Sequence, residues 1–205
     1  MPATSAEHLI NTLVEAGVKH LFTLSGNQIL DIYDATIGRD IELIHTRHEA
    51  AAVHMADGWG RLTETPGVAL LTAGPGHCTG LTALYVALMS ESPLVLLSGH
   101  CPTSEIGKGS FQEMDQVGLA RPVAKAAWLV ERPEDLSNEI SRALHLASSG
   151  RPGPVHLSLP NDILPATVAP APPQPLEIEA APVDEALLTQ ALDLLAESRH
   201  PLLLV

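Results

Sequence analysis

Residues 68–98 read VALLTAGPGHCTGLTALYVALMSESPLVLLS, and this stretch decides the fold class of the 205-residue chain. An unbroken apolar run at 68–73 meets the turn Gly74-Pro75-Gly76, after which a long apolar segment extends to residue 89. A second unbroken apolar run follows at 93–98. Short strands that lack polar–apolar alternation are typical of parallel sheets with both faces covered, and a helix is their usual crossover. The stretch therefore predicts a strand–helix–strand unit of an α/β fold.

The rest of the chain repeats this succession of apolar strands and helices. We expect further strands at 18–24, 41–46, 124–130 and 154–159, and helices that begin near Ser5, Ile29, His48 and Pro133. The first of these helices follows Thr4-Ser5-Ala6-Glu7, which has the spacing of a capping box. The pattern predicts a central, mostly parallel sheet with helices on both faces.

Domain boundaries are marked by a change in composition. Residues 1–163 form the predicted α/β domain, and residues 164–183 carry a series of prolines typical of an extended linker. A helix at 183–198 and an apolar run at 201–205 then indicate the start of a second α/β domain. Because one helix and one strand cannot enclose a core, we expect 184–205 to be the truncated beginning of that domain.

The composition excludes several functional classes. Hydrophobic residues make up 45% and charged residues 17%, which is typical of a well-packed core rather than of disorder. A formal net charge of -13 argues against binding to nucleic acid or to an anionic membrane. The chain has no apolar run of about 18 residues and no signal-peptide pattern. Two cysteines, Cys78 and Cys101, make no disulfide framework, so we expect a cytoplasmic protein with no membrane partner.

Several catalytic patterns fail on single positions. The dinucleotide-binding fingerprint needs glycine where the chain has Thr79, and a Walker loop needs a Lys-Ser or Lys-Thr pair that the turn lacks. A zinc-protease helix beginning at His48 needs a second histidine at Ala52. A serine-hydrolase elbow needs glycine at Leu96. No metal ligands are predicted within the chain, and a nucleotide-dependent enzyme that uses the Gly74 loop stays as an alternative.

Two segments carry side chains suited to a binding site. Residues 47–61 place Glu49 at the start of an Ala-rich helix, where small residues allow close packing that removes the carboxylate from water. Such a carboxylate either caps its own helix or meets a ligand. Residues 107–113 form a glycine-rich loop that carries Phe111 and Gln112. It is either a mobile surface loop or one whose aromatic side chain packs into a neighbouring surface.

Taken in order, these segments resemble the N-terminal pyrimidine-binding (PYR) domain of the thiamine diphosphate-dependent enzymes, nearest to the acetolactate synthase group. The matching segments are Arg47-His48-Glu49, Ala56-Asp57-Gly58 with Arg61, Pro66-Gly67-Val68, Thr72-Ala73-Gly74-Pro75-Gly76, Ser92-Pro93-Leu94-Val95, Phe111-Gln112-Glu113 and Ser149-Gly150-Arg151-Pro152-Gly153-Pro154-Val155. The resemblance covers residues 4–163 and implies the thiamin diphosphate-binding fold. It also implies that the linker leads into the central domain of such an enzyme.

The resemblance implies a role for Glu49. In this family the matching glutamate hydrogen-bonds N1′ of the cofactor's aminopyrimidine and so promotes removal of the proton from thiazolium C2. Thiamine diphosphate is the implied cofactor, with Mg²⁺ held by residues outside this chain; FAD is compatible with the family but has no support here. The implied reaction is decarboxylation of a 2-oxo acid followed by carboligation, in a homodimer or homotetramer with the cofactor at the subunit interface. On its own the chain is expected to be inactive.

Further site residues are implied by position. The cofactor-binding residues are Glu49, Ser25, Gly26, Asn27, Thr72, Gly74, Pro75, Gly76 and His77. Phe111 and Gln112 match a loop that in acetolactate synthases reaches the active site of the partner subunit and lines the substrate region. Lys125 matches a lysine near that entrance, where a cation suits an anionic substrate.

Two places depart from the acetolactate synthase pattern. His77-Cys78-Thr79 follow the turn where the family usually has Ala-Thr-Asn, and Ser25-Gly26-Asn27 replaces a Pro-Gly-Gly turn. Both changes bring polar side chains near the substrate or the pyrimidine. A 2-hydroxyacyl-CoA lyase, an oxalyl-CoA or benzoylformate decarboxylase and a pyruvate-oxidising enzyme therefore stay open, as does a degenerate member that serves as a binding module. The substrate is a 2-oxo acid or an acyl-CoA accordingly.

Overall fold

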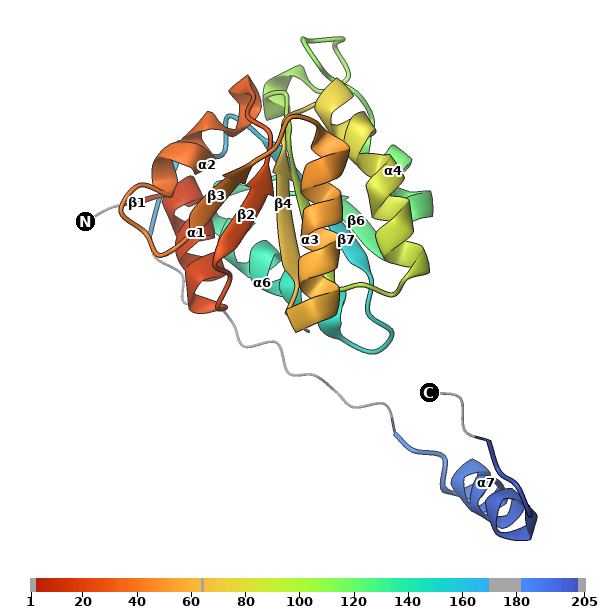
Figure 1. The fold of residues 1–205 in the computed structure, drawn as a ribbon. Coiled ribbons are helices and arrows are strands. Elements are labelled where there is room, and N and C mark those ends of the chain that lie inside the picture. Colours follow the sequence, from red (N-terminus) through yellow and green to blue (C-terminus); the bar gives the residue numbers. More distant parts are fainter. Residues whose placement is uncertain (1–2, 64, 170–181, 203–205) are drawn as a thin grey trace.

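The computed structural model describes residues 3–63, 65–169 and 182–202. Its centre is a six-stranded sheet in which all neighbouring strands are parallel (Figure 1). The strand order is β3-β2-β4-β5-β7-β6. The strands are β2 (His20–Thr23), β3 (Glu42–His45), β4 (Gly67–Leu71), β5 (Leu94–His100), β6 (Ala126–Leu129) and β7 (Pro154–Pro160). The predicted α/β fold with a central parallel sheet is confirmed.

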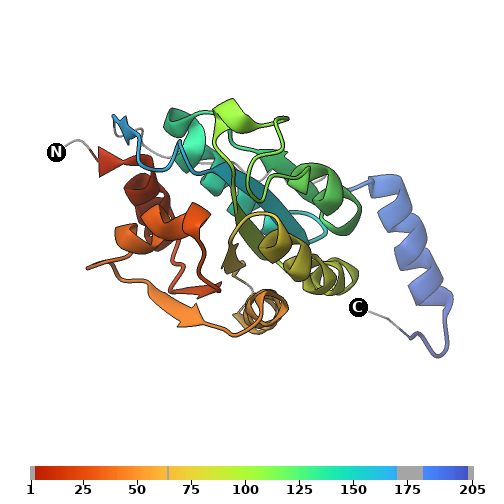
Figure 2. The same cartoon turned by 90° about the horizontal axis from the view of Figure 1, so that it is seen from above.

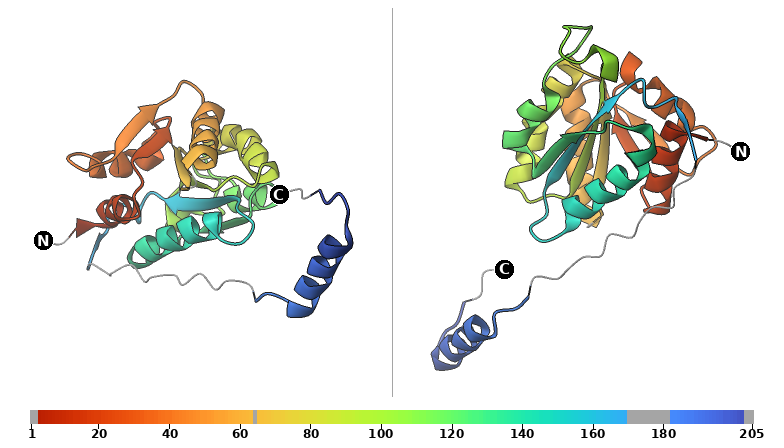
Figure 3. Two further views of the ribbon diagram at one scale, coloured as in Figure 1. Left: turned by 60° about the horizontal axis from the view of Figure 1, so that its bottom comes forward. Right: turned by 180° about the vertical axis from the view of Figure 1, so that it is seen from behind.

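Helices cover both faces of this sheet, as the view from above shows (Figure 2). One face, seen from behind in Figure 3, carries α1 (Ser5–Glu15), α2 (Leu30–Ala35) and α6 (Leu136–Ser148). The other face carries α3 (Glu49–Thr63), α4 (Pro75–Met89) and α5 (Gln116–Ala120). Short 3-10 helices lie in the connections: η1 (Asn27–Ile29), η2 (Thr103–Glu105), η3 (Arg121–Val123) and η4 (Pro133–Asp135). Within the described ranges, no helix is both long and apolar enough to cross a membrane.

The two faces of each central strand supply two separate hydrophobic clusters. Val95 and Leu97 of β5 belong to the cluster under α1, α2 and α6, whereas Leu94 and Leu96 belong to the cluster under α3 and α4. Both sides of the strand are therefore apolar, which explains why the central strands show no alternation in sequence. Toward the carboxyl end of β5 the buried residues are no longer all apolar, because Ser98 is polar and fully buried.

The start of the chain is tied to the segment that follows β7. Thr4 caps α1 in the predicted capping box, and β1 (Ala3–Thr4) pairs antiparallel with β8 (Thr167–Val168). The buried Ser5 hydroxyl donates to a main-chain carbonyl of this returning segment at 2.6 Å. The compact domain thus extends through β8, beyond the expected boundary at residue 163. Much of the expected linker, residues 170–181, lies outside the described residues.

The last helix, α7 (Glu185–Glu197), agrees with the helix expected at 183–198. The Asp184 carboxylate caps α7 by accepting hydrogen bonds from two main-chain amides of its first turn. Every described residue of α7 is exposed. Pro201 and Leu202 form no strand, and residues 203–205 of the expected strand lie outside the described residues. That 184–205 begins a second domain stays a prediction.

Candidate functional site

The central sheet has a switch point between β2 and β4. The chain leaves β2 toward α2 on one face of the sheet and leaves β4 toward α4 on the other. In open α/β sheets, ligands usually bind beyond the carboxyl ends of the strands at the point where the connections diverge in this way. These ends lie along the upper edge of the sheet in Figure 1. The predicted cofactor residues 25–27 and 72–76 follow these two strands directly.

The segments after β2 and β4 touch each other at this edge. A Cβ on Gly26 would overlap the Thr72 side chain, so only glycine allows the approach. The Thr72 hydroxyl in turn donates to Oε1 of Gln28 at 2.7 Å. Ser25 and Asn27 flank Gly26 and are exposed. Their polar side chains are therefore accessible to a ligand at this edge of the sheet.

The turn at Gly74 has a backbone geometry that requires glycine. Its φ of 59° and ψ of -115° lie in a region that L-residues rarely adopt. A Cβ there would stand 2.7 Å from the Gln112 carbonyl oxygen, so the loop at 107–113 packs directly on the turn. Pro75 then begins α4 at a position where no amide hydrogen is needed.

Glu49 is the first residue of α3 and reaches the same turn. Its Oε1 lies 3.5 Å from the place that a Cβ on Gly76 would take. The helix is capped by His48 instead, because Nδ1 of His48 accepts from the Ala50 amide at 3.3 Å. The Glu49 side chain is half-buried, not removed from water as expected, and its carboxylate has no hydrogen-bond or ion-pair partner in the described part of the chain. The geometry favours a carboxylate that meets a ligand over one that caps its own helix.

This edge of the sheet fits an aminopyrimidine ring. Such a ring is flat and carries nitrogen atoms at its rim that donate and accept hydrogen bonds. Gly26, Gly74 and Gly76 allow the segments at this edge to pack closely, and the Glu49 carboxylate, which has no partner among the described residues, lies beside Gly76. The residues described here include no cluster of three or more His, Cys, Asp or Glu side chains that could hold a metal ion. What the chain itself offers is a surface for the organic ring.

His77, a predicted cofactor contact, directs its imidazole into the interior. The residue is fully buried, and its Nδ1 lies 2.9 Å from the Ser98 hydroxyl in a hydrogen bond. The ring of buried His156 lies 4.5 Å away between centroids. Burial lowers the pKa of His77 to about 4, so its ring is neutral at pH 7. The His77 ring is therefore part of the buried interior beneath the turn and is not accessible to a ligand at the strand ends.

The loop at 107–113 is folded around the carboxylate of Glu113. That carboxylate accepts hydrogen bonds from the main-chain amides of Gly107, Gly109 and Ser110, at 2.6 Å for Gly109 and 3.2 Å for Ser110. These amides, that of Gly107 above all, hold the pKa of Glu113 below its usual range. The loop therefore has a defined shape and is not an irregular surface segment.

The two substrate residues predicted on this loop have different surroundings. Gln112 has a left-handed φ of 61° and contacts Gly74, so it adjoins the turn. Phe111 is 73% exposed among the residues that the structure describes. An exposed phenylalanine on a well-formed loop suits contact with another surface.

Lys125, the third predicted substrate residue, lies away from this cluster. It directly precedes β6, so it stands at the amino ends of the parallel strands, whereas the Gly74 turn stands at their carboxyl ends. Its ammonium group donates to the carbonyls of Leu146 and Ser149, each at 2.6 Å, at the end of α6. Burial lowers the pKa of Lys125. Within this chain Lys125 stabilises a helix terminus, and any substrate contact would have to form elsewhere in an assembly.

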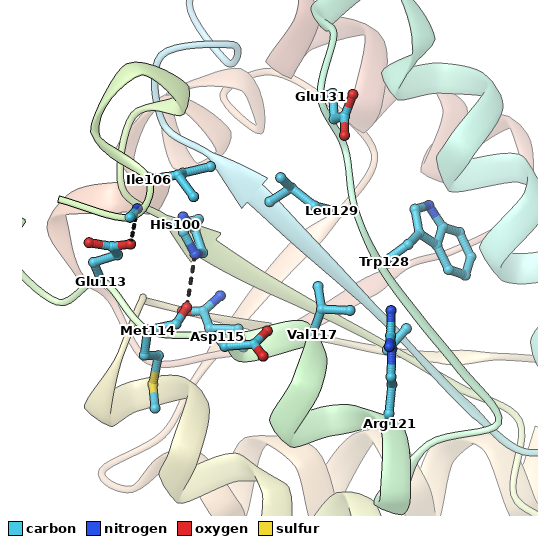
Figure 4. A pocket seen from close by; sticks show the side chains of 13 residues that line it. His100, Ile106, Glu113, Met114, Asp115, Val117, Arg121, Trp128, Leu129 and Glu131 are labelled. Atoms are coloured by element: carbon cyan, nitrogen blue, oxygen red, sulfur yellow. Dashed lines mark hydrogen bonds between the residues drawn. The ribbon is translucent and has the colours of Figure 1, made fainter. Parts of the chain in front are cut away.

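A pocket of about 540 Å³ opens between the 106–117 segment and β6 (Figure 4). Its apolar wall comes from Ile106, Val117 and Leu129. His100 lies at one side of the pocket, and its Nε2 is hydrogen-bonded to the Met114 carbonyl at 3.1 Å. Sequence patterns do not indicate this pocket because its walls come from separate segments of the chain.

Gln116 belongs to the site and is not singled out by the sequence. Its side-chain oxygen accepts a hydrogen bond from the Gly74 amide at 2.9 Å. A single glutamine after a loop has no spacing or motif that marks it. Only the packing of α5 against the strand ends brings it to the turn.

Comparison with known proteins agrees with this geometry. Residues 3–119 match the family described as "Thiamine pyrophosphate enzyme, N-terminal TPP binding domain". The chain belongs to this family. The predicted membership of the thiamine diphosphate-dependent enzymes is therefore confirmed.

Similar curated proteins are acetolactate synthases. The isozyme 3 large subunit of Escherichia coli is 48% identical over 163 residues, which cover 78% of this chain and 28% of that protein. The probable large subunit of Methanocaldococcus jannaschii is 40% identical over 158 residues, covering 77% and 27%. The enzyme of Arthrospira platensis is 37% identical over 212 residues, covering 98% and 37%. The chain thus spans well under half the length of these relatives.

The comparisons confirm the acetolactate synthase-like character of the domain. They do not favour the alternative family members, namely the 2-hydroxyacyl-CoA lyase and the oxalyl-CoA and benzoylformate decarboxylases. They also give no support to an acyl-CoA substrate or to a nucleotide-dependent enzyme.

Proposed function

We propose that this chain supplies the Glu49 side of a thiamine diphosphate site in an acetolactate synthase-like enzyme that acts on 2-oxo acids. The observation that carries the proposal is the unpartnered Glu49 carboxylate beside Gly76, at the switch point of the sheet. The reaction is decarboxylation of one 2-oxo acid and transfer of the remaining acyl group to an acceptor. Its two halves are a lyase step and a transferase step.

The part played by Glu49 follows from its surroundings. When bound, the cofactor supplies a thiazolium carbon, C2, that becomes a nucleophile once its proton is removed. Glu49 holds a proton at N1′ of the aminopyrimidine by a hydrogen bond to its carboxylate. Ala52 and Val53, one turn further along α3, are fully buried, so Glu49 stands at the start of a helix that packs on the core. An apolar surrounding would strengthen the hydrogen bond to the ring nitrogen, and at Gly76 the carboxylate meets main chain without a side chain.

The exposed surface of α3 and α4 supports an assembly of several subunits. Helix α4 contains no Asp, Glu, Lys or Arg, and Tyr85, Val86 and Met89 are 49%, 39% and 66% exposed on it. Met55 of α3 is also 42% exposed. A helix that is apolar all round is normally covered on all sides. We expect a homodimer or homotetramer that covers this surface, with the diphosphate and Mg²⁺ held by residues outside the described chain.

A reducing compartment, the cytoplasm, suits the cysteines. Cys78 and Cys101 are both free thiols. Cys101 is buried, and burial raises the pKa of its thiol, so the reactive thiolate form is suppressed.

The proposal is tested by calorimetric titration of thiamine diphosphate with Mg²⁺ into the intact protein. We expect saturable binding to the unsubstituted protein and clearly weaker binding to Glu49→Ala. In Glu49→Gln, which keeps the size of the side chain, we expect nearly complete loss of hydrogen–deuterium exchange at C2 of the bound cofactor.

Glu15→Gln serves as the matched control, because Glu15 is an exposed glutamate at the end of α1. It should leave both cofactor affinity and exchange unchanged. Absence of binding to the unsubstituted protein would indicate a degenerate member that keeps only the scaffold. Exchange at the normal rate in Glu49→Gln would remove Glu49 from the reaction.

A further inference from the structure

Gln116 connects three strands of the sheet through one buried amide. It is the first residue of α5 and only 1% exposed. Its Oε1 accepts from the Gly74 amide at 2.9 Å, and its Nε2 donates to the Gly99 carbonyl at 3.1 Å and to the Ser158 hydroxyl at 2.7 Å. Gly74 lies in the turn after β4, Gly99 lies near the end of β5, and Ser158 lies in β7. The side-chain oxygen and both amide hydrogens are therefore fully used.

The turn at Gly74 depends on this contact. The Gly74 amide stands at the N-terminus of α4, where main-chain amides have no partner within the helix. Leaving such a group buried without an acceptor is costly, and the Gly74 backbone is already in a conformation that few residues adopt. Oε1 of Gln116 supplies the acceptor and holds it rigidly, because the same amide is anchored to Gly99 and Ser158.

The position of the turn decides the space beside Glu49. Only Pro75 separates Gly76 from Gly74. A Cβ on Gly76 would stand 2.6 Å from Cγ2 of Thr72 and 3.5 Å from Oε1 of Glu49. The backbone is thus confined between Thr72 and the carboxylate. A displacement of the turn would therefore change the distance between its backbone and the Glu49 carboxylate.

We propose that Gln116 is a positioning residue, which fixes the Gly74–Gly76 turn at the distance from Glu49 that a bound aminopyrimidine requires. This inference rests on the proposed function. Gln116 acts through the turn, because its side-chain oxygen is bonded to the Gly74 amide. Its neutral amide also suits its position, because the neighbouring buried His77 is neutral.

The test compares Gln116→Met with the unsubstituted intact protein, since methionine matches glutamine in length and removes all three hydrogen bonds. We expect the dissociation constant for thiamine diphosphate with Mg²⁺ to rise about tenfold, because the bond to the Gly74 amide is the one of the three that bears on the turn and its loss has about that effect. At saturating cofactor we also expect C2 exchange to fall about tenfold, because the ring is bound out of line with Glu49.

A double-mutant cycle separates positioning from loss of stability. If Gln116 acts through Glu49, then Gln116→Met should slow exchange in the normal protein and have little further effect in Glu49→Gln. Ser5→Ala is the control for stability, because the buried Ser5 hydroxyl bonds a main-chain carbonyl far from the turn. It should lower the unfolding temperature and leave exchange unchanged.

Gln116→Asn keeps the test decisive if the methionine variant does not fold. Asparagine retains the amide but is one methylene too short to reach Gly74 and Ser158 together, so a smaller loss of exchange, about threefold, is expected. Normal affinity and exchange in a folded Gln116 variant would overturn the inference, and so would an unchanged effect in the Glu49→Gln background. If the normal protein binds the cofactor and Glu49→Gln loses exchange, the proposed function stands even when Gln116 fails its own test.

Discussion

Oε1 of Glu49 lies 3.5 Å from the place that a Cβ on Gly76 would occupy, although the two residues lie in the first turns of helices that follow different strands. The meeting is a consequence of the parallel sheet, whose strands all end at the same edge. Helix α3 brings a carboxylate to that edge, and the turn before α4 brings a surface without side chains. A carboxylate without a partner, next to main chain that carries no side chain, makes this edge suitable for a flat ring that forms hydrogen bonds.

Gly76→Ala should weaken cofactor binding about tenfold and lower the unfolding free energy by about 1 kcal/mol. The new methyl group would stand 2.6 Å from Cγ2 of Thr72, so either Thr72 or the turn has to move. Calorimetric titration and urea unfolding measure the two effects. Gly58→Ala is the control, because nothing lies within 4 Å of a Cβ at that helical position. It should raise stability by about 0.5 kcal/mol and leave affinity unchanged; equal behaviour of the two variants would contradict the close fit at Gly76.

Stability should fall as the pH drops below about 6.5, because of the buried histidines. Burial lowers the pKa of His77 to about 4 and that of His156 well below its usual value of 6.5. Between these values the unfolded chain binds protons that the folded chain does not, so acid favours unfolding, while above about 6.5 these two groups have no effect. We expect His77 to contribute a loss of about 2 kcal/mol between pH 7 and pH 5 and His156 to contribute a further loss in the same direction, measured by urea unfolding.

His77→Gln should reduce this dependence on pH by about half, whatever it does to absolute stability. Replacement of the exposed His54 by Gln should leave the dependence unchanged. Equal stability of the normal protein at the two pH values would show that the buried rings are not held neutral.

Lys125→Met should lower the unfolding free energy by about 1 kcal/mol without affecting cofactor affinity. The ammonium group bonds the carbonyls of Leu146 and Ser149 at the end of α6, and this contact is lost. Thermal unfolding and calorimetric titration measure the two quantities. An increase in KM for the 2-oxo acid at unchanged stability would instead favour the substrate-entrance role that the family resemblance implies.

Phe111→Ala should change the unfolding free energy of this domain by less than about 0.5 kcal/mol, because the side chain is 73% exposed and buries little surface. In the intact enzyme we expect kcat/KM for the 2-oxo acid to fall severalfold if the loop lines a site across a subunit interface. Lys108→Ala on the same loop serves as control. Gly109→Ala is less suitable, because alanine would be strained at the left-handed φ of 70° that Gly109 adopts. Normal kcat/KM in Phe111→Ala would exclude a role for the phenylalanine in substrate binding.

Local sequence predicted most of the elements because their signals are local. Apolar runs without alternation indicated the parallel strands, the Thr4 capping box indicated α1, and the Gly74 turn marked the passage from β4 to α4. The domain boundary was less well defined, since proline content predicts a linker from 164, whereas β8 returns to pair with the N-terminus. Pairing with a distant strand leaves no mark in the composition of the segment itself.

The sequence by itself determined the α/β class, the family and the glycine turn, because each of these depends on residue types at fixed spacing. The role of Glu49 stays a prediction from the family resemblance. Only the tertiary structure decided where the neighbouring side chains point. It turned His77 toward Ser98, placed Lys125 at the opposite edge of the sheet and brought Gln116 to the Gly74 amide. The physical reason is that a side chain beyond a strand end takes its direction from the strands and helices packed around it, and these come from distant parts of the chain.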